Sequence, residues 1–526
     1  MRVHDWGRRA RLIGAAALLA GAATVARAET VLKVVPYTDL QILDPIVSTS
    51  GMTAVHAFMI YDTLFSWDAS NRAQPQMVGS HGISSDGLVH RLTLREGLAF
   101  HDGRPVKPTD VVASLRRWMI RDTLGQRLGS RLAAIEAEGD RTIVIRLKEP
   151  YGWVALSLGS SGGNPPVIMR AEEAATDPAK PVTETIGSGP FVFARSEWMQ
   201  GSRVVYRKNV AYVPRTEPPS NMAGGKAVKV DRVDWIIMPD EQTSISALIA
   251  GEVDVVNVPP PDLVPALKKN SDIVVAPLAP DYIALMRPNH LHPPFNNPKA
   301  RQALALMVDQ QDYLSAAFGG LGKPCYSFFT CVGSLPATAG SEPYQKPDPA
   351  KARQLMADAG YKGEKIVQIG VSDIFFHNAI AQVTIEKLRS IGVNVDPQLA
   401  SAGVMQARRA KKDPPAAGGY NLFQTSLDTI TLSSPLTNIA AGTDCDGKNW
   451  PGWPCDEEAS RLQAQYINAT DDAEQRRILE ALNQRLWEVI PYVILAQFER
   501  PSAWRKNIVG LLRANFPVSW NVEKRG

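Results

Sequence analysis

Alternating apolar and polar residues mark two strands in the first third of the chain. In residues 90–95, Leu92 and Leu94 fall on one face, and residues 141–147 alternate in the same way through Ile143, Ile145 and Leu147. Asp-Gly and Gly-Asp pairs, which favour turns, stand just before the two runs. The pattern therefore predicts two strands, each with one buried face.

Helical periodicity dominates the second half and comes with clear start signals. Asn297 followed by proline opens a helix that runs to Val308, and Asp348 followed by proline opens another that ends at Gly360. Asp471 opens a long helix whose apolar residues share one face: Leu479, Leu482, Leu486 and Val489. Mixed strands and helices predict an α/β protein.

Glycine and proline clusters divide the chain. They occupy residues 185–190, 258–261 and 277–280. The chain has 526 residues, too many for a single hydrophobic core, so two or three domains are expected.

The first 28 residues have the pattern of a secretory signal peptide. A basic start is followed by an uncharged apolar run over 12–26 and by Ala26-Arg27-Ala28, a small-x-small cleavage site. The run is shorter than the roughly 20 residues of a membrane-spanning helix. The first cysteine is Cys325, so a lipid anchor at the new N-terminus is not expected. We expect export to the periplasm without an anchor, by either the general or the twin-arginine route.

Removing this segment changes the charge balance. The whole chain has 57 Lys and Arg against 53 Asp and Glu, and residues 1–28 hold five of the basic and one of the acidic residues. The remainder carries 52 of each, a formal net charge of zero. No overall positive field is left to attract nucleic acid or an anionic membrane.

Four cysteines form two pairs that are close in sequence. In an oxidising compartment the pairs Cys325–Cys331 and Cys445–Cys455 predict two short disulfide loops, although four cysteines allow three connectivities. A zinc site is the alternative, but these spacings do not match the usual ligand patterns.

Residues 159–163 satisfy the G-x-S-x-G pattern of serine hydrolases, which makes an exported hydrolase using Ser161 one hypothesis. The nucleophile of that pattern needs a helix directly after it, whereas Asn164 and two prolines follow here. A loop near a ligand is the preferred interpretation. The chain contains neither a P-loop nor an H-E-x-x-H motif, and no cofactor is expected.

Several segments together resemble the family 5 extracellular solute-binding proteins, which include dipeptide, oligopeptide and nickel receptors. The resemblance is carried by segments along nearly the whole chain, namely Leu43-Asp44-Pro45, residues 61–65, 85–97, 100–103, 109–112, 187–191 and 299–304.

The resemblance implies a two-lobed periplasmic binding protein fold (type II, cluster C-like) with an extra domain. The first lobe is then discontinuous, comprising 29–63, 186–277 and 499–526. The extra domain is expected at 64–185 and the second lobe at 278–498.

The implied function is that of a substrate-binding protein of an ABC importer, not an enzyme. It would capture a peptide or peptide-like solute between its lobes and deliver it to the permease and ATPase subunits. We expect a monomer. A receptor for a non-peptide solute or a metal chelate is the alternative within the same class.

The resemblance also implies a ligand site made of loops from both lobes. Asp428 stands where an acidic residue often pairs with a peptide amine. The family's nearby Trp and Asp-Pro are missing, and an exposed loop carboxylate is the alternative for Asp428. Arg287 is expected to pair with a ligand carboxylate or with the opposite lobe. The other candidates are Ser48, Thr49, Ser50, Gly51, Gly162, Gly163, Asn164, Asn289, Phe376, His377 and Ser426.

Overall fold

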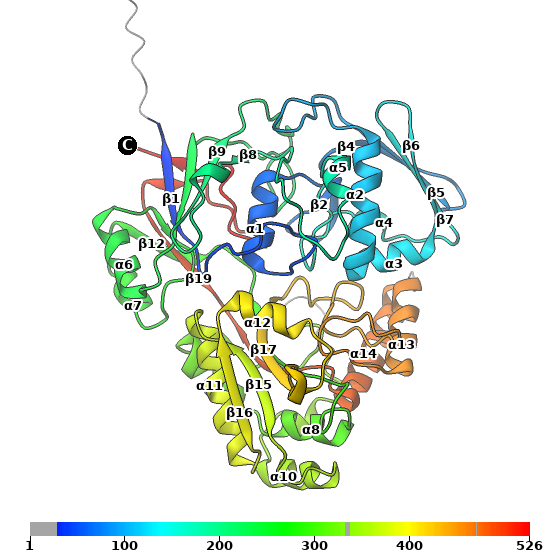
Figure 1. Cartoon of the computed structure of the whole chain (residues 1–526), viewed down its shortest axis with the longest axis vertical. Helices are drawn as coiled ribbons and strands as arrows, with labels where there is room; N and C mark the ends of the chain where they lie inside the picture. The colour runs from blue at the N-terminus through cyan, green and yellow to red at the C-terminus, as the bar shows by residue number, and fades with distance from the viewer. Residues whose placement is uncertain (1–28, 332–336, 470) are drawn as a thin grey trace, which may run out of the picture.

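The computed structural model describes residues 29–331, 337–469 and 471–526, so the expected signal peptide lies outside the described residues. Two large bodies lie one above the other in Figure 1. Each is built around its own sheet, and a third, smaller sheet extends the first body.

The sheet of the first lobe draws strands from distant parts of the chain. Its seven strands follow the order β12-β19-β11-β1-β10-β9-β8, and β1 runs parallel to both of its neighbours. The strands are β12 (Ile273–Pro277), β19 (Pro501–Arg505), β11 (Val255–Val256), β1 (Val31–Val35), β10 (Arg232–Ile236), β9 (Arg203–Lys208) and β8 (Phe191–Phe193). Helices α1 (Gly51–Ile60) and α6 (Glu241–Ala250) belong to this lobe.

The extra domain is an antiparallel sheet with helices packed on it. Its strands β4 (Val78–Ile83), β5 (Val89–Leu94), β7 (Thr142–Leu147) and β6 (Leu132–Glu138) pair in that order. The two strands predicted from alternation are β5 and β7, and their central apolar residues are buried, so that prediction is confirmed. Helices α2 (Pro108–Arg121) and α3 (Thr123–Arg131) complete the domain.

The second lobe contains the long helices that the sequence predicts. Its sheet has the order β14-β18-β13-β17-β15-β16, with strands β14 (Gly322–Lys323), β18 (Val493–Phe498), β13 (Tyr282–Pro288), β17 (Leu422–Asp428), β15 (Ile366–Val371) and β16 (Val395–Ala400). The surrounding helices are α8 (Pro298–Leu306), α9 (Gln310–Phe318), α10 (Pro349–Asp358), α11 (Phe375–Ser390), α12 (Ala402–Arg409), α13 (Glu457–Asn468) and α14 (Asp472–Val489).

Helix caps explain why the predicted helix starts are correct. The side chains of Asn297, Asp348 and Asp471 accept hydrogen bonds from the first-turn amides of α8, α10 and α14. The apolar face predicted for the last of these helices is buried against the rest of the second lobe.

The buried apolar residues form three clusters. One lies in the second lobe, one runs from the first lobe into the extra domain and also includes Leu436 and Ile467 of the second lobe, and a smaller one lies within the first lobe. Within the first lobe, the chain packs tightly against the end of α1 at Gly187, because a Cβ there would lie 1.8 Å from the carbonyl oxygen of Ile60.

Two connections link the lobes and are called the hinge connections below. Residues 278–281 join β12 to β13, and Glu499-Arg500 joins β18 to β19. Both lead from one sheet into the other, as the red segment at β19 shows in Figure 1.

Both predicted disulfides are present, Cys325–Cys331 and Cys445–Cys455, so the zinc alternative for these residues is wrong. Among the described residues, none of the helices has the length and apolar character that crossing a membrane requires.

Candidate ligand-binding site

Two adjoining cavities lie between the lobes and define the candidate site. The inner cavity has a volume of about 120 Å³ and the outer one about 670 Å³. They share five lining residues, Thr49, Gly163, Gln406, Arg409 and Trp450. Both lobes and the extra domain contribute to the walls, so a bound solute would touch all three.

The first-lobe side of the inner cavity is formed where α1 begins. Thr49, Ser50 and Gly51 line it, close to the loop that carries Gly162 and Gly163. A Cβ at Gly162 would lie 2.5 Å from the hydroxyl oxygen of Thr431 in the second lobe. Glycine at this position therefore allows the loop to approach the opposite lobe.

Direct hydrogen bonds hold the lobes together around the cavities. The guanidinium of Arg409 donates to the Thr49 hydroxyl over 2.7 Å, and the Ser48 hydroxyl donates to Gln406 over 3.3 Å. Farther out, the Trp153 indole of the extra domain donates to the carbonyl of Ile467 in α13. The structure is therefore a closed form in which the cavities are covered.

Strand β17 presents a free edge to the inner cavity. It pairs with β13 along its full length, but its ladder with β15 ends at Phe423. The residues beyond that point line the cavity from Thr425 to Asp428. Backbone amide and carbonyl groups on that side of β17 are therefore placed where an extended solute can pair with them.

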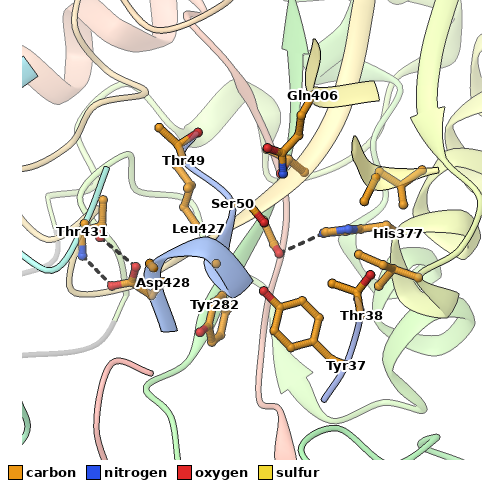
Figure 2. Close-up of a pocket in the computed structure, with 18 of the residues that line it drawn as sticks. Tyr37, Thr38, Thr49, Ser50, Tyr282, His377, Gln406, Leu427, Asp428 and Thr431 are labelled. Carbon is orange, nitrogen blue, oxygen red and sulfur yellow. Dashed lines mark hydrogen bonds between the residues drawn. The ribbon is translucent and has the colours of Figure 1, made fainter. Parts of the chain in front are cut away.

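Asp428 ends β17 and is buried, with 9% of its surface exposed. One oxygen accepts from the Thr431 amide over 2.8 Å and the other from the Thr431 hydroxyl over 2.7 Å, as Figure 2 shows. Burial raises its pKa, and the Thr431 hydrogen bonds and the charge of Arg500 oppose the rise. The exposed-loop alternative for Asp428 is wrong, because the carboxylate belongs to the cavity wall.

His377 extends from the start of α11 toward β17. Its Nε2 lies 3.0 Å from the Ser426 hydroxyl. Burial, together with the positive charges of Arg500 and Arg409, lowers the pKa of His377 to about 3. The ring is therefore neutral at pH 7.

Arg500 lies on a hinge connection and lines the inner cavity. Its guanidinium carbon stands 3.4 Å from the centre of the Tyr282 ring and 5.3 Å from that of Tyr37. Burial raises the pKa of Tyr37 to about 12, although the charge of Arg500 acts in the opposite direction. The two tyrosines thus face the arginine as neutral rings.

Arg409 ends α12 and lines both cavities. Its guanidinium lies over the rings of Phe423 and Trp450. Burial lowers the pKa of Arg409 to about 10, so the side chain still carries its charge at pH 7.

Three predicted site residues lie outside both cavities. Arg287 is fully buried and donates to the carbonyls of Ala440, Trp450, Pro451 and Pro491, so the prediction that it pairs with a ligand carboxylate or with the opposite lobe is wrong. Those contacts fix the loops of the second lobe to its sheet.

Asn289 and Phe376 are likewise part of the framework. The Asn289 amide donates to the carbonyl of Tyr420, and the Phe376 ring packs at 6.0 Å from Phe498, between ring centres. Asn164 lines only the outer cavity, and its amide donates to the carbonyls of Pro45 and Ser48.

The hydrolase hypothesis fails on the surroundings of Ser161. The residue is 1% exposed, and its hydroxyl oxygen accepts a hydrogen bond from the Asn515 amide instead of facing a histidine. It follows the short helix α4 (Val154–Ser157), whereas the hydrolase pattern requires a strand before the serine.

Sequence reasoning missed several lining residues. These are Tyr37, Tyr282, Gln406, Arg409, Trp450 and Arg500. Arg500 stands two positions after the end of the buried strand β18, and the charged pair Glu499-Arg500 at the end of an apolar run was a signal that could have marked it. The others lie on segments far apart in sequence that only the fold brings together.

A two-lobed protein that encloses a cavity between its lobes is a solute-binding protein by fold and site. Residues 72–442 match the bacterial extracellular solute-binding proteins, family 5 middle region, and the chain belongs to this family. Proteins of this family are the non-enzymatic substrate-binding components of ABC importers and work with permease and ATPase subunits.

Similarity to named relatives extends over nearly the whole chain. The probable peptide ABC transporter periplasmic-binding protein y4tO of Sinorhizobium fredii is 40% identical over 495 residues, covering 92% of each chain. The glutathione-binding protein GsiB of Escherichia coli (strain K12) is 26% identical over 490 residues, covering 89% of each chain.

Solved structures share the fold. The binding protein AgaA from A.tumefacien R10, in complex with agropinic acid, has a TM-score of 0.80 and 22% identity over 94% of this chain and 99% of the other. DppA from Helicobacter pylori, in complex with the peptide STSA, has a TM-score of 0.75 and 22% identity over 95% and 99%.

Proposed function

We propose that this protein captures a peptide or peptide-like solute in the periplasm and delivers it to the permease of an ABC importer. The observation that carries the proposal is the free edge of β17 inside the interlobe cavity. An extended solute can add to that edge through main-chain hydrogen bonds, which are the same for every peptide. The name of the relative y4tO is consistent with this solute class.

The covered cavity supports the transport step. In the closed form the lobes bond each other at Arg409–Thr49 and Ser48–Gln406, contacts that a solute in the cavity would reinforce. Binding energy then shifts the protein toward the closed form, which the permease distinguishes from the open one.

The proposal also includes export of the chain and the limits of its domains. Residues 1–28 act as a signal peptide, and the mature protein works without a lipid anchor as a monomer. The first lobe comprises 29–63, 186–277 and 499–526, the extra domain 64–185 and the second lobe 278–498. The distribution of the three sheets along the chain supports these limits.

The hydrogen bonds that Asp428 already accepts favour a second class of solute, one without a free amine. Both carboxylate oxygens are already bonded by Thr431, so a ligand amine would have to share them. A peptide-like solute without a free amine, or a non-peptide solute, fits this arrangement better than an unmodified peptide does.

Native mass spectrometry of the purified protein, followed by calorimetric titration with di- to pentapeptides, tests the proposal. We expect a co-purified peptide, or saturable peptide binding that raises the melting temperature. A bound small molecule of another class, with no peptide binding, would refute the peptide proposal and leave the receptor class intact.

A variant can localise the site. Ser426→Pro removes a backbone amide that points away from β13, because its neighbours Thr425 and Leu427 are the residues that hydrogen-bond with that strand, and it should weaken peptide binding without regard to peptide sequence. Thr142→Pro, a proline in strand β7 of the extra domain, serves as the matched control. Equal effects of the two variants on binding would argue against β17 as the peptide edge.

A further inference from the structure

The charged residues around the two cavities are unequal in sign. Five cationic side chains line them against two carboxylates, Asp122 and Asp428. The cations are Arg121, Arg409, Lys412, Lys448 and Arg500. A solute entering this space meets a net positive wall.

Among the described residues, neither carboxylate forms an ion pair with one of these cations. Asp122 caps α3 and accepts from the amides of Leu124, Gly125 and Asn164. Asp428 is held by Thr431, as described above. Both acids thus have their oxygens committed to neighbouring backbone or hydroxyl groups.

Among the described residues, Lys448 is the only one of these five cations with a carboxylate within ion-pair distance, that of Asp446, and Arg409 and Arg500 are the two that line the inner cavity. Arg409 has the Thr49 hydroxyl and two aromatic rings as neighbours, and Arg500 has the faces of Tyr282 and Tyr37. Rings attract a cation without neutralising it. The Nε of Arg500 is also buried without an acceptor among the residues described. A covered charge in this condition is costly unless an anion joins it.

Both arginines act on the same part of the cavity. Each lowers the pKa of His377, which lines the inner cavity between α11 and β17. Arg500 reaches this region from the hinge connection, and Arg409 reaches it from the end of α12.

We propose that the solute carries a carboxylate, that Arg500 is its main contact and that Arg409 supports the same charge. This inference rests on the proposed receptor function and names the chemical class of its solute. Because Arg500 lies between β18 and β19, a carboxylate that binds it and touches the second lobe is held fully only when the lobes are closed. Charge recognition and closure are thereby coupled.

Three blocked peptides separate this inference from the peptide proposal. The probes are N-acetyl-trialanine with a free carboxylate, its C-terminal amide, and N-acetyl-Ala-Asp-Ala amide, which carries its carboxylate on a side chain. Small mono- and dicarboxylic acids without a peptide bond form a second panel. Each is titrated into the dialysed protein by calorimetry at low and at high salt.

We expect an acid to bind about ten- to a hundredfold more tightly than the matching amide, because hydrogen bonds to charged groups are the stronger ones. Comparing the affinities of the two peptide acids shows whether the protein binds a carboxylate at the end of the peptide or on one of its side chains. Equal binding of acid and amide would overturn the inference and leave peptide import standing. Binding of the non-peptide acids alone would support the inference and overturn peptide import, and no binding of any acid would overturn both.

Variants assign the effect to the arginines. Arg500→Gln should remove most of the acid-over-amide preference, Arg409→Gln part of it, and Arg500→Lys should retain much of it. Arg476→Gln, on the exposed face of α14, is the matched control for charge. A preserved preference in both glutamine variants, with unchanged thermal unfolding, would contradict the assignment.

Discussion

The two bodies of the molecule bury positive charge in different ways. In the first lobe and extra domain, Arg117 pairs with Asp44 and Lys226 with Asp62, and all four side chains are at most 1% exposed. In the second lobe, the buried arginines Arg287 and Arg301 bond backbone carbonyls.

Chain connectivity gives a reason for the difference. The first body is assembled from segments far apart in sequence, and its buried pairs join residues 73 and 164 positions apart. The second lobe is one continuous stretch, in which arginines tie loops to the sheet. Arg409 belongs to the second lobe but bonds the first lobe at Thr49. Among these arginines and lysines, it is therefore the one whose hydrogen bond depends on the lobes being closed.

The largest effect should come from breaking a buried pair. Asp44→Ala leaves Arg117 buried without its carboxylate and also frees the amides of Ile46 and Val182. We expect a loss of about 3–5 kcal/mol in the free energy of unfolding, measured with urea. The exposed pair Arg91–Glu138 supplies the control, because Glu138→Ala should leave the urea midpoint unchanged. Similar midpoints for the two variants would show that the pair does not hold the first body together.

A smaller loss is expected from Arg287→Lys in the second lobe. One ammonium group cannot reach the four carbonyls that the guanidinium bridges, so buried acceptors lose their donors. The expected cost is about 2–3 kcal/mol in urea unfolding. Arg408→Lys is the comparison, since Arg408 also bonds two carbonyls but is half-buried, where water can replace the donor. An equal loss of unfolding free energy in both variants would show that burial of the Arg287 guanidinium is not the cause.

The smallest effect is on the free energy of unfolding at acid pH, and it comes from His56 in the first body. Burial lowers the pKa of His56 to about 3, with the charge of Arg195 acting in the same direction, whereas an unfolded histidine titrates near 6.5. Between these values the unfolded state binds a proton that the folded state does not, so stability falls as pH decreases. His56→Phe should reduce the slope of unfolding free energy against pH, from 6.5 to 5, by up to about 1.4 kcal/mol per pH unit. An unchanged slope would mean that other groups, such as His101, control the acid sensitivity.

What the sequence determined about this protein is mostly local. Alternation identified β5 and β7, and capping residues identified the starts of α8, α10 and α14, because these signals depend on neighbours within a few positions. Cysteines six and ten residues apart identified both disulfides. Family-like segments along the chain also identified the class of protein, which the comparisons confirm.

Only the tertiary structure decided which residues line the cavities between the lobes. Arg287 and Arg500 look alike in sequence, each at one end of a strand in the same sheet, yet the first is enclosed by carbonyls and the second faces the cavity. The difference depends on loops more than 150 residues away in sequence that close over Arg287, and on the two hinge connections that bring Tyr282 against Arg500. Burial and charge compensation depend on such long-range contacts, which no local pattern of residues encodes.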